Sequence, residues 1–387
     1  MEYPDVSYSY SYSSFYYSSN SNFTNGFEGE TGVHAILVPI IFGIITVVGL
    51  IGNGCVVIVI ARNRCMRTVT NFFIMNNAIT DMVFVVICAP VTASQFILTD
   101  WIFGDFICKL VVFMQYVSVQ ASCSTIMAMT IDRYMVILHP MRSLHARTIR
   151  RTTCINIVIW LTSFLLHVPV AIYYEQVSEP NNGYFCGTNF VNITASKIYH
   201  FYAVIVLYVF PFLVMTFCYL RILRKVWSKY LIVTSSTQTQ RKRRWKITRM
   251  TLLVVILFGI CWGPIHAVHL VALFKTATSA TEIDWSYYNF SIFCLCISYS
   301  NSAINPFVYA FSGRSYRSLL LSCLKRKPGK NPVSRMCSSR TKAGSAQYSL
   351  EMNNLIRTNG QNGRSPKTRY TNQYIGGGRH IVRAVPE

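Results

Sequence analysis

The stretch GVHAILVPIIFGIITVVGLIGNGCVVIVIA, residues 32–61, contains no Asp, Glu, Lys or Arg. A helix that crosses the ~30 Å hydrocarbon core of a bilayer needs about 20 mainly apolar residues. This stretch is therefore long enough to span a membrane, although one such stretch could also be a buried helix of a large soluble core.

Six further stretches of this kind follow, and only Asp81 interrupts the second of the seven. The predicted helices run at about 33–61, 71–98, 107–138, 152–174, 198–226, 246–274 and 285–312. The chain is 52% hydrophobic and only 13% charged, which is too apolar for an ordinary soluble domain of 387 residues. Seven stretches together predict an all-α integral membrane protein, with a seven-transmembrane helix bundle over residues 33–312.

Lys and Arg are distributed unevenly between the connections. None precedes Arg62, and they cluster after the first, third and fifth stretches, whereas most acidic residues fall in the N-terminal tail and the other connections. Because cytoplasmic loops collect Lys and Arg, this pattern predicts a multi-pass plasma-membrane protein with its N-terminus extracellular and its C-terminus cytoplasmic. We attribute the net charge of +22 to this topology and to contact with anionic membrane lipid, and we expect no nucleic-acid binding.

Both ends of the chain have the composition of disordered tails. Residues 1–32 form the predicted extracellular tail and lack a cleavable signal peptide, so the first helix is expected to act as an uncleaved anchor. Glycan acceptor patterns occur at Asn22 and Asn192, both on the predicted outer side. Residues 313–324 predict an amphipathic helix 8 with a palmitoylation site at Cys323, and residues 325–387 predict a disordered cytoplasmic tail. Candidate phosphorylation sites in that tail are Ser338, Ser339, Ser345 and Ser349.

Only two of the thirteen cysteines lie on the predicted outer side, and the rest fall in helices or on the cytoplasmic side, where thiols stay reduced. Cys108 is at the outer end of the third helix and Cys186 is in the loop after the fourth. We therefore expect a disulfide between them that ties this loop across the mouth of a ligand cavity.

Short motifs mark each predicted helix. They are Gly52-Asn53, Asn76-x-Ala-x-x-Asp81, Asp132-Arg133-Tyr134, Trp160, Pro211 with Tyr219, Phe258 with Cys261-Trp262-Gly263-Pro264, and Asn305-Pro306-Phe307-Val308-Tyr309. Over residues 35–323 the chain thereby resembles rhodopsin-like (class A) G-protein-coupled receptors. Within that family, the runs 115–123, 262–265 and 298–306 resemble kisspeptin receptors, with galanin and allatostatin-A receptors as near relatives.

The resemblance implies a receptor and not an enzyme. It implies that binding of an extracellular peptide activates a heterotrimeric G protein, of the Gq class with calcium and phospholipase C signalling. Receptor kinases and arrestin are the further partners that it implies.

Asp81 is an ionisable residue at mid-membrane, which marks a candidate functional site because burying a lone charge there is costly. In the resembled family, residues that match Asp81, Ser122, Trp262, Asn301 and Asn305 surround a sodium ion, which is the one cofactor-like group implied. The alternative is a neutral or water-bridged Asp81 that hydrogen-bonds Asn53 and Asn305.

The resemblance also implies an activation switch. Its residues are Asp132, Arg133, Tyr134, Tyr219, Phe258, Trp262, Pro264, Asn305, Pro306 and Tyr309. We expect Asp132 to bind Arg133 at rest and release it to a G protein, and Pro264 and Pro306 to act as hinges. Many relatives add an acid at the base of helix six, but residues 241–249 contain none, so we expect measurable basal signalling.

The ligand is constrained by what the helices lack. Gln115 stands where amine receptors carry an Asp, and no Lys lies between positions 275 and 325 to bind retinal. The outer loops instead combine acidic and aromatic residues, which suits a cationic peptide through charge steering and cation–π contact, unless these residues serve solvation alone. The expected ligand contacts are Gln115, His266, His269, Glu175, Tyr287, Tyr288 and Trp101, and further loop acids are Glu179, Glu282 and Asp284.

Kisspeptin-like ligands end in an amidated Arg-Phe type terminus, so Gln115, His266 and His269 are expected to meet the amide. The two histidines could also be packing residues. A galanin-like or allatostatin-A-like peptide is the alternative ligand. A channel or transporter is the alternative of another class, but no conduction path or internal repeat is visible.

Overall fold

The computed structural model describes residues 28–178, 183–190, 192–228, 238–274, 285–312, 368–375 and 379–386. They belong to two units, Met1–Lys325 and Arg326–Glu387, which are described separately. Several predictions lie outside the described residues: helix 8 at 313–324, Asn22, Glu179, Glu282, Asp284, Cys323 and the four tail serines.

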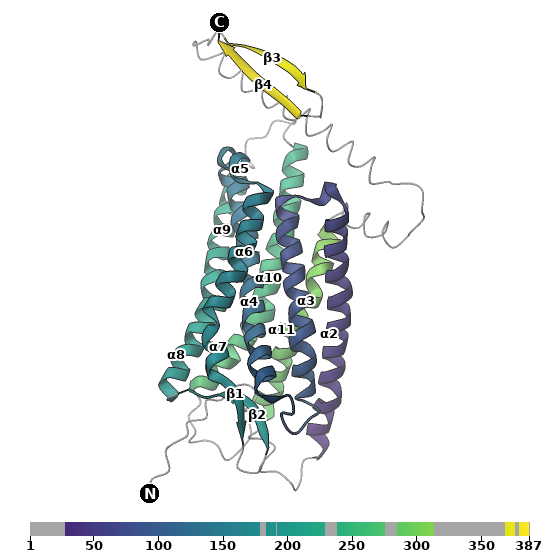
Figure 1. Cartoon of the computed structure of the whole chain (residues 1–387), viewed down its shortest axis with the longest axis vertical. Coiled ribbons are helices and arrows are strands. Elements are labelled where there is room, and N and C mark those ends of the chain that lie inside the picture. Colours follow the sequence, from purple (N-terminus) through teal and green to yellow (C-terminus); the bar gives the residue numbers. More distant parts are fainter. Residues whose placement is uncertain are drawn as a thin grey trace, which may run out of the picture. The chain divides into compact units, whose positions relative to one another are not determined.

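The first unit is a bundle of long helices, as the sequence predicted (Figure 1). The long helices are α2 (Glu28–Arg62), α3 (Val69–Ser94), α4 (Gly104–Leu138), α6 (Ile149–Leu166), α9 (Phe210–Ser228), α10 (Gln238–Phe274) and α11 (Trp285–Ser312). The central helix is α4, which contacts α3, α6, α9 and α10, while α11 packs against both α10 and α2. Six segments of the described chain are long and apolar enough to cross a membrane, and α11 is also long but richer in Ser, Asn and Tyr.

The side chains are sorted as expected for a bundle in lipid. Large apolar side chains face outward, such as Ile36, Ile40 and Ile44 along α2. Polar side chains are buried instead, including Asn77 and Asp81. This arrangement keeps polar groups away from hydrocarbon, where each unpaired one costs several kcal/mol.

The two ends of α4 define the two ends of the bundle. A helix rises about 1.5 Å per residue, so Cys108 and Arg133 on α4 lie far apart along the bundle axis. We call the end with Cys108 the hairpin end, because the hairpin β1 (Tyr174–Ser178) and β2 (Tyr184–Thr188) lies there. We call the other the Arg133 end, which also carries η1 (Arg64–Met66) and α5 (Pro140–Ala146).

Two predicted helices are interrupted. The stretch 152–174 was expected to be one helix, but it divides into α6 and α7 (Val168–Tyr173), because Pro169 in the first turn of α7 has no N–H to continue the helix. The stretch 198–226 comprises α8 (Ile193–Val204), a π-helical turn η2 (Ile205–Val209) and α9. This wide turn precedes Pro211, whose ring would clash with the carbonyl four residues earlier in a regular α-helix.

Several predicted boundaries also differ. The first helix begins at Glu28, inside the tail predicted to be disordered over 1–32, and α10 begins at Gln238 where 246 was predicted. The predicted helix 71–98 ends at Ser94, and the predicted helix 107–138 begins at Gly104, whose φ of 78° is readily accessible only to glycine. Hydropathy detects the membrane-buried part of a helix, so polar turns beyond that part escape it.

Two hairpins were not predicted. Strands β1 and β2 pair antiparallel, with Gln176 opposite Cys186. In the second unit, β3 (Thr368–Ile375) and β4 (Arg379–Pro386) also pair antiparallel, within the tail 325–387 for which disorder was predicted.

Candidate functional site

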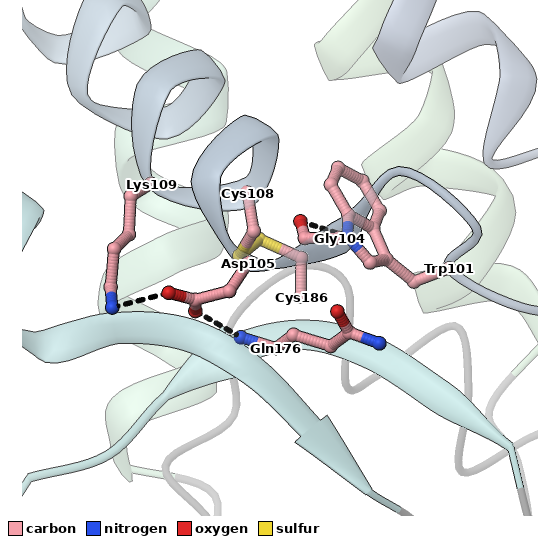
Figure 2. The surroundings of a disulfide bond; sticks show 7 residues. All are labelled: Trp101, Gly104, Asp105, Cys108, Lys109, Gln176 and Cys186. Carbon is pink, nitrogen blue, oxygen red and sulfur yellow. Dashed lines mark hydrogen bonds and ion pairs between the residues drawn. A yellow bond between two sulfur atoms is a disulfide. The ribbon is translucent and has the colours of Figure 1, made fainter.

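The hairpin end is fastened to α4 by one covalent bond and by hydrogen bonds to backbone groups. Figure 2 shows the Cys108–Cys186 disulfide, with 5.5 Å between the two Cα atoms, as the sequence predicted. Beside it, Asp105 accepts the Gln176 backbone N–H at 3.0 Å and the Lys109 ammonium at 2.6 Å. The β1–β2 hairpin is therefore fixed at several points over the end of the bundle.

Trp101 adds a further attachment to the same hairpin. Its backbone N–H donates to the Tyr184 carbonyl at 2.8 Å, and its indole N–H donates to the Gly104 carbonyl at 2.9 Å. The side chain is buried and packs edge-on against Phe103. Trp101 thus positions the loop as well as lining the cavity beneath it.

Beneath the hairpin lies a cavity between α3, α4, α10 and α11. Its wall includes Gln115, Tyr116, Trp262, His266 and His269. The described part of this wall contains no Asp, Glu, Lys or Arg. A charged group buried there would have no ionic partner among these residues, whereas a neutral polar group could hydrogen-bond to Gln or His.

The expected ligand contacts divide into two groups. Gln115, His266, His269, Tyr287 and Trp101 all line the cavity. The other two do not line this cavity: Tyr288 packs against the rings of His34 and Trp285, and Glu175 accepts the Asn189 side-chain amide at 2.6 Å. Both side chains are oriented by local partners, and these partners cannot be read from composition.

His266 is a buried polar side chain that faces the cavity. It is 6% exposed, and neither ring nitrogen has a hydrogen-bond partner among the described residues. Its ring lies 5.2 Å from that of Tyr208, which in turn stacks on Phe258 at 6.1 Å. A ligand that bonds His266 would therefore be connected to Phe258 through the ring of Tyr208.

Sequence reasoning missed three residues in this region. Tyr116 and His200 line the cavity, and Tyr208 connects His266 to Phe258. Tyr116 directly follows Gln115 and could have been considered from that position. Nothing in the sequence indicates Tyr208, because its place depends on the π-helical turn in which it lies.

In the middle of the bundle, Asp81 is surrounded by amide groups. Its Oδ2 accepts from the side-chain amides of Asn77 and Asn305, both at 2.9 Å. Asn77 accepts from Ser122 at 3.0 Å and donates to the Tyr309 hydroxyl at 3.4 Å. These contacts link α3, α4 and α11 through one carboxylate.

The alternative to a sodium site was an Asp81 that hydrogen-bonds both Asn53 and Asn305. Asn53 does not make this contact. Its amide donates to the Gly49 and Ser302 carbonyls, which ties α2 to α11. The neighbouring Gly52 lies so close to α11 that a Cβ there would be 2.9 Å from Cγ of Pro306. The Gly52-Asn53 motif therefore serves close packing of these two helices.

At the Arg133 end, the Asp132-Arg133 pair is joined by a third charged residue. The Arg133 guanidinium lies 3.7 Å from the Asp132 carboxylate and donates to the Thr70 hydroxyl. Arg147, in the connection after α5, bonds the same carboxylate at 2.7 and 3.1 Å. No motif in the sequence predicted this contact of Arg147.

The remaining switch residues occupy positions consistent with a packed interior. Tyr219, Phe258 and Tyr309 are buried, and Trp262 is buried with its ring 6.0 Å from that of Phe84. Tyr134 packs against the His139 ring at 5.7 Å. Pro264 lies inside α10 and Pro306 inside α11, where each removes one helical hydrogen bond.

Known proteins resemble this chain over most of its length. The family model described as 7 transmembrane receptor (rhodopsin family) matches residues 52–309. The chain is 38% identical to G-protein coupled receptor 54 of Oreochromis niloticus over 297 residues, which are 73% of this chain and 77% of that protein. It is 37% identical to the KiSS-1 receptor of Homo sapiens, over 74% and 73% of the two chains. It is 33% identical to galanin receptor type 1 of Rattus norvegicus, over 74% and 81%.

Proposed function

Because this chain belongs to the rhodopsin family of seven-transmembrane receptors, we propose that it binds a peptide with an amidated C-terminus and activates a heterotrimeric G protein. The peptide enters from the hairpin end, which faces the outside of the cell. The G protein, of the Gq class, binds at the Arg133 end in the cytoplasm. Receptor kinases and arrestin then act on the C-terminal tail.

One observation carries the choice of ligand. The described cavity wall has no Asp, Glu, Lys or Arg, but it does have Gln115, His266 and His269. A C-terminal carboxylate buried there would lose its hydration without gaining an ionic partner, whereas a carboxamide can donate and accept hydrogen bonds while neutral. The relatives named for KiSS-1 support the same class of peptide.

The test compares one peptide in two forms. Cells that express the chain are given peptides ending in Arg-Phe-amide and the same peptides as free acids, and intracellular calcium is measured. We expect the amidated form to be about 100-fold more potent, because an unpaired buried charge is costly. Untransfected cells are the control.

The relatives named for galanin support a second candidate ligand class. A calcium response to galanin-type peptides, with none to Arg-Phe-amides, would identify a galanin-type peptide as the ligand class and exclude Arg-Phe-amides. Allatostatin-A peptides belong in the same panel, because the allatostatin-A receptor of Bombyx mori is 32% identical to this chain. Equal potency of acid and amide in all three classes would contradict amide recognition.

We also propose a sodium ion as an allosteric modulator beside Asp81. The Asp81 carboxylate, the Ser122 hydroxyl and the Asn305 amide are oxygen donors, which suit a hard cation. The Asn305 Oδ1 atom is buried without a hydrogen-bond partner among the described residues, which leaves an acceptor for a cation or water. Asn301 is buried nearby on α11, and Trp262 would border the ion, because an indole offers no oxygen.

Orientation can be tested separately from ligand identity. An epitope tag before Met1 should be stained on intact cells, and a tag after Glu387 should be stained only after permeabilisation. Staining of both tags on intact cells would contradict the topology, and with it the placing of peptide and G protein at opposite ends.

A further inference from the structure

Asp132 has two arginine partners that differ in geometry. Arg147 takes both carboxylate oxygens, with Nε at 2.7 Å from Oδ1 and Nη2 at 3.1 Å from Oδ2. Arg133 approaches only Oδ2, at 3.7 Å. A two-point arginine–carboxylate pair is stronger and better oriented than a single long contact. The residue adjacent to Asp132 in sequence is therefore its weaker partner.

Thr70 on α3 connects the same three side chains. Its hydroxyl accepts from Nη2 of Arg133 and, at 3.4 Å, from Nη2 of Arg147. The side chains of Asp132 and Arg133 are only 8% and 6% exposed, whereas that of Arg147 is 30% exposed. The buried Asp132 carboxylate is thus paired with Arg147, whose side chain remains in contact with water.

This arrangement changes the energy of moving Arg133. If Asp132 had Arg133 as its only cation, then turning Arg133 toward a G protein would leave a buried carboxylate unpaired, which is strongly unfavourable. With Arg147 in place, Asp132 remains paired after Arg133 departs. Repulsion between the two guanidinium groups further weakens the attachment of Arg133 at rest.

We propose that Arg147 is a positioning residue for G-protein coupling, which acts as the lasting counter-ion of Asp132 and thereby allows Arg133 to leave. The proposal rests on the proposed function, since it concerns coupling at the Arg133 end. It also gives the connection between α5 and α6 a role in setting basal activity. That role matters here because residues 241–249 contain no acid that could attract Arg133 from α10.

The first experiment measures nucleotide exchange on a purified Gq-class protein by membranes with equal amounts of each variant. Arg147→Gln should lower exchange about threefold, with and without amidated peptide, because Asp132 then binds Arg133 more tightly. Peptide affinity should stay unchanged. Arg150→Gln removes the same charge from an exposed side chain in the first turn of α6 and should behave like the wild type.

The mechanism predicts that Arg147 acts only through Asp132. In an Asp132→Asn background, Arg147→Gln should therefore have no further effect on exchange. A loss of similar size in that background would mean that Arg147 meets the G protein directly, and it would overturn the proposal. Equal exchange by Arg147→Gln and the wild type would overturn it as well.

A second experiment does not depend on signalling. Thermal melting of the detergent-solubilised chain is measured for Asp132→Asn, Arg147→Gln and the double variant. We expect the two single shifts to be non-additive by about 2 °C, because the two side chains form one ion pair. Additive shifts would overturn the proposal. If no peptide stimulates exchange by the wild type or Arg150→Gln while the melting shifts stay non-additive, the proposed ligand fails and the ion pair stands.

Discussion

The hairpin end and the Arg133 end of the bundle are fastened by different chemistry. At the hairpin end, the Cys108–Cys186 disulfide and hydrogen bonds to backbone groups secure a hairpin over a cavity whose described wall has no Asp, Glu, Lys or Arg. At the Arg133 end, two arginines share one carboxylate and one hydroxyl. The first set of contacts preserves a shape, whereas the second can exchange partners at a small cost in free energy. A receptor needs both properties, at opposite ends.

The largest effect is expected from removing the covalent bond. Cys108→Ser should abolish most cell-surface receptor, because a native disulfide of this kind contributes about 2–5 kcal/mol and here also orders the hairpin. Surface staining measures the loss. Cys154→Ser, which removes a free and exposed thiol, should leave staining unchanged. Normal surface amount and peptide affinity for Cys108→Ser would show that hydrogen bonds alone secure the hairpin end.

The next largest effect should come from the cavity wall. His266→Leu should lower the potency of the amidated peptide by about 10- to 100-fold, because a buried hydrogen bond to the ligand is lost. Tyr288→Phe, at a position outside the cavity wall, should change potency far less. Calcium dose–response curves measure both. A greater loss for Tyr288→Phe would contradict the assignment of the cavity.

The middle of the bundle, where Asp81 accepts hydrogen bonds from Asn77 and Asn305, can be tested with sodium. In the wild type, replacing sodium chloride by an organic-cation chloride should raise agonist affinity about fivefold. Asp81→Asn should abolish this dependence, and Asp100→Asn should preserve it. An affinity that is insensitive to sodium in the wild type would leave Asp81 a structural residue only.

The smallest effect is expected at the surface of the hairpin end. Asp105→Asn should lower the unfolding free energy by less than about 1 kcal/mol, because its ion pair with Lys109 is largely exposed to solvent. Thermal melting measures the change. A loss as large as that of Cys108→Ser would mean that Asp105, and not the disulfide, secures the hairpin.

The sequence predicted the bundle well, because lipid imposes a simple rule on every spanning helix. It predicted less where local backbone chemistry decides, as at Pro169, which ends one helix and starts another, and at the π-helical turn before Pro211. The β1–β2 hairpin was missed because its five-residue strands are too short for a clear alternating pattern.

The candidate site shows the same division. Gln115, His266 and His269 could be placed in one cavity because they lie on helices, where spacing along the chain determines direction. Tyr288 is also on a helix, but its ring packs against His34 and Trp285 and does not line the cavity. Arg147 escaped prediction because its partner Asp132 is fifteen residues away, across a turn whose path no periodic pattern describes.

The absence of Asp, Glu, Lys and Arg from the described cavity wall has a consequence for pharmacology. A site built around a salt bridge selects ligands that carry an ionised group when bound, because a neutral ligand would leave the buried charge of the site unpaired. A wall of aromatic rings, imidazoles and the two primary amides of Gln95 and Gln115 can be filled by an uncharged heteroaromatic compound, so non-peptide antagonists of this receptor need carry no ionised group.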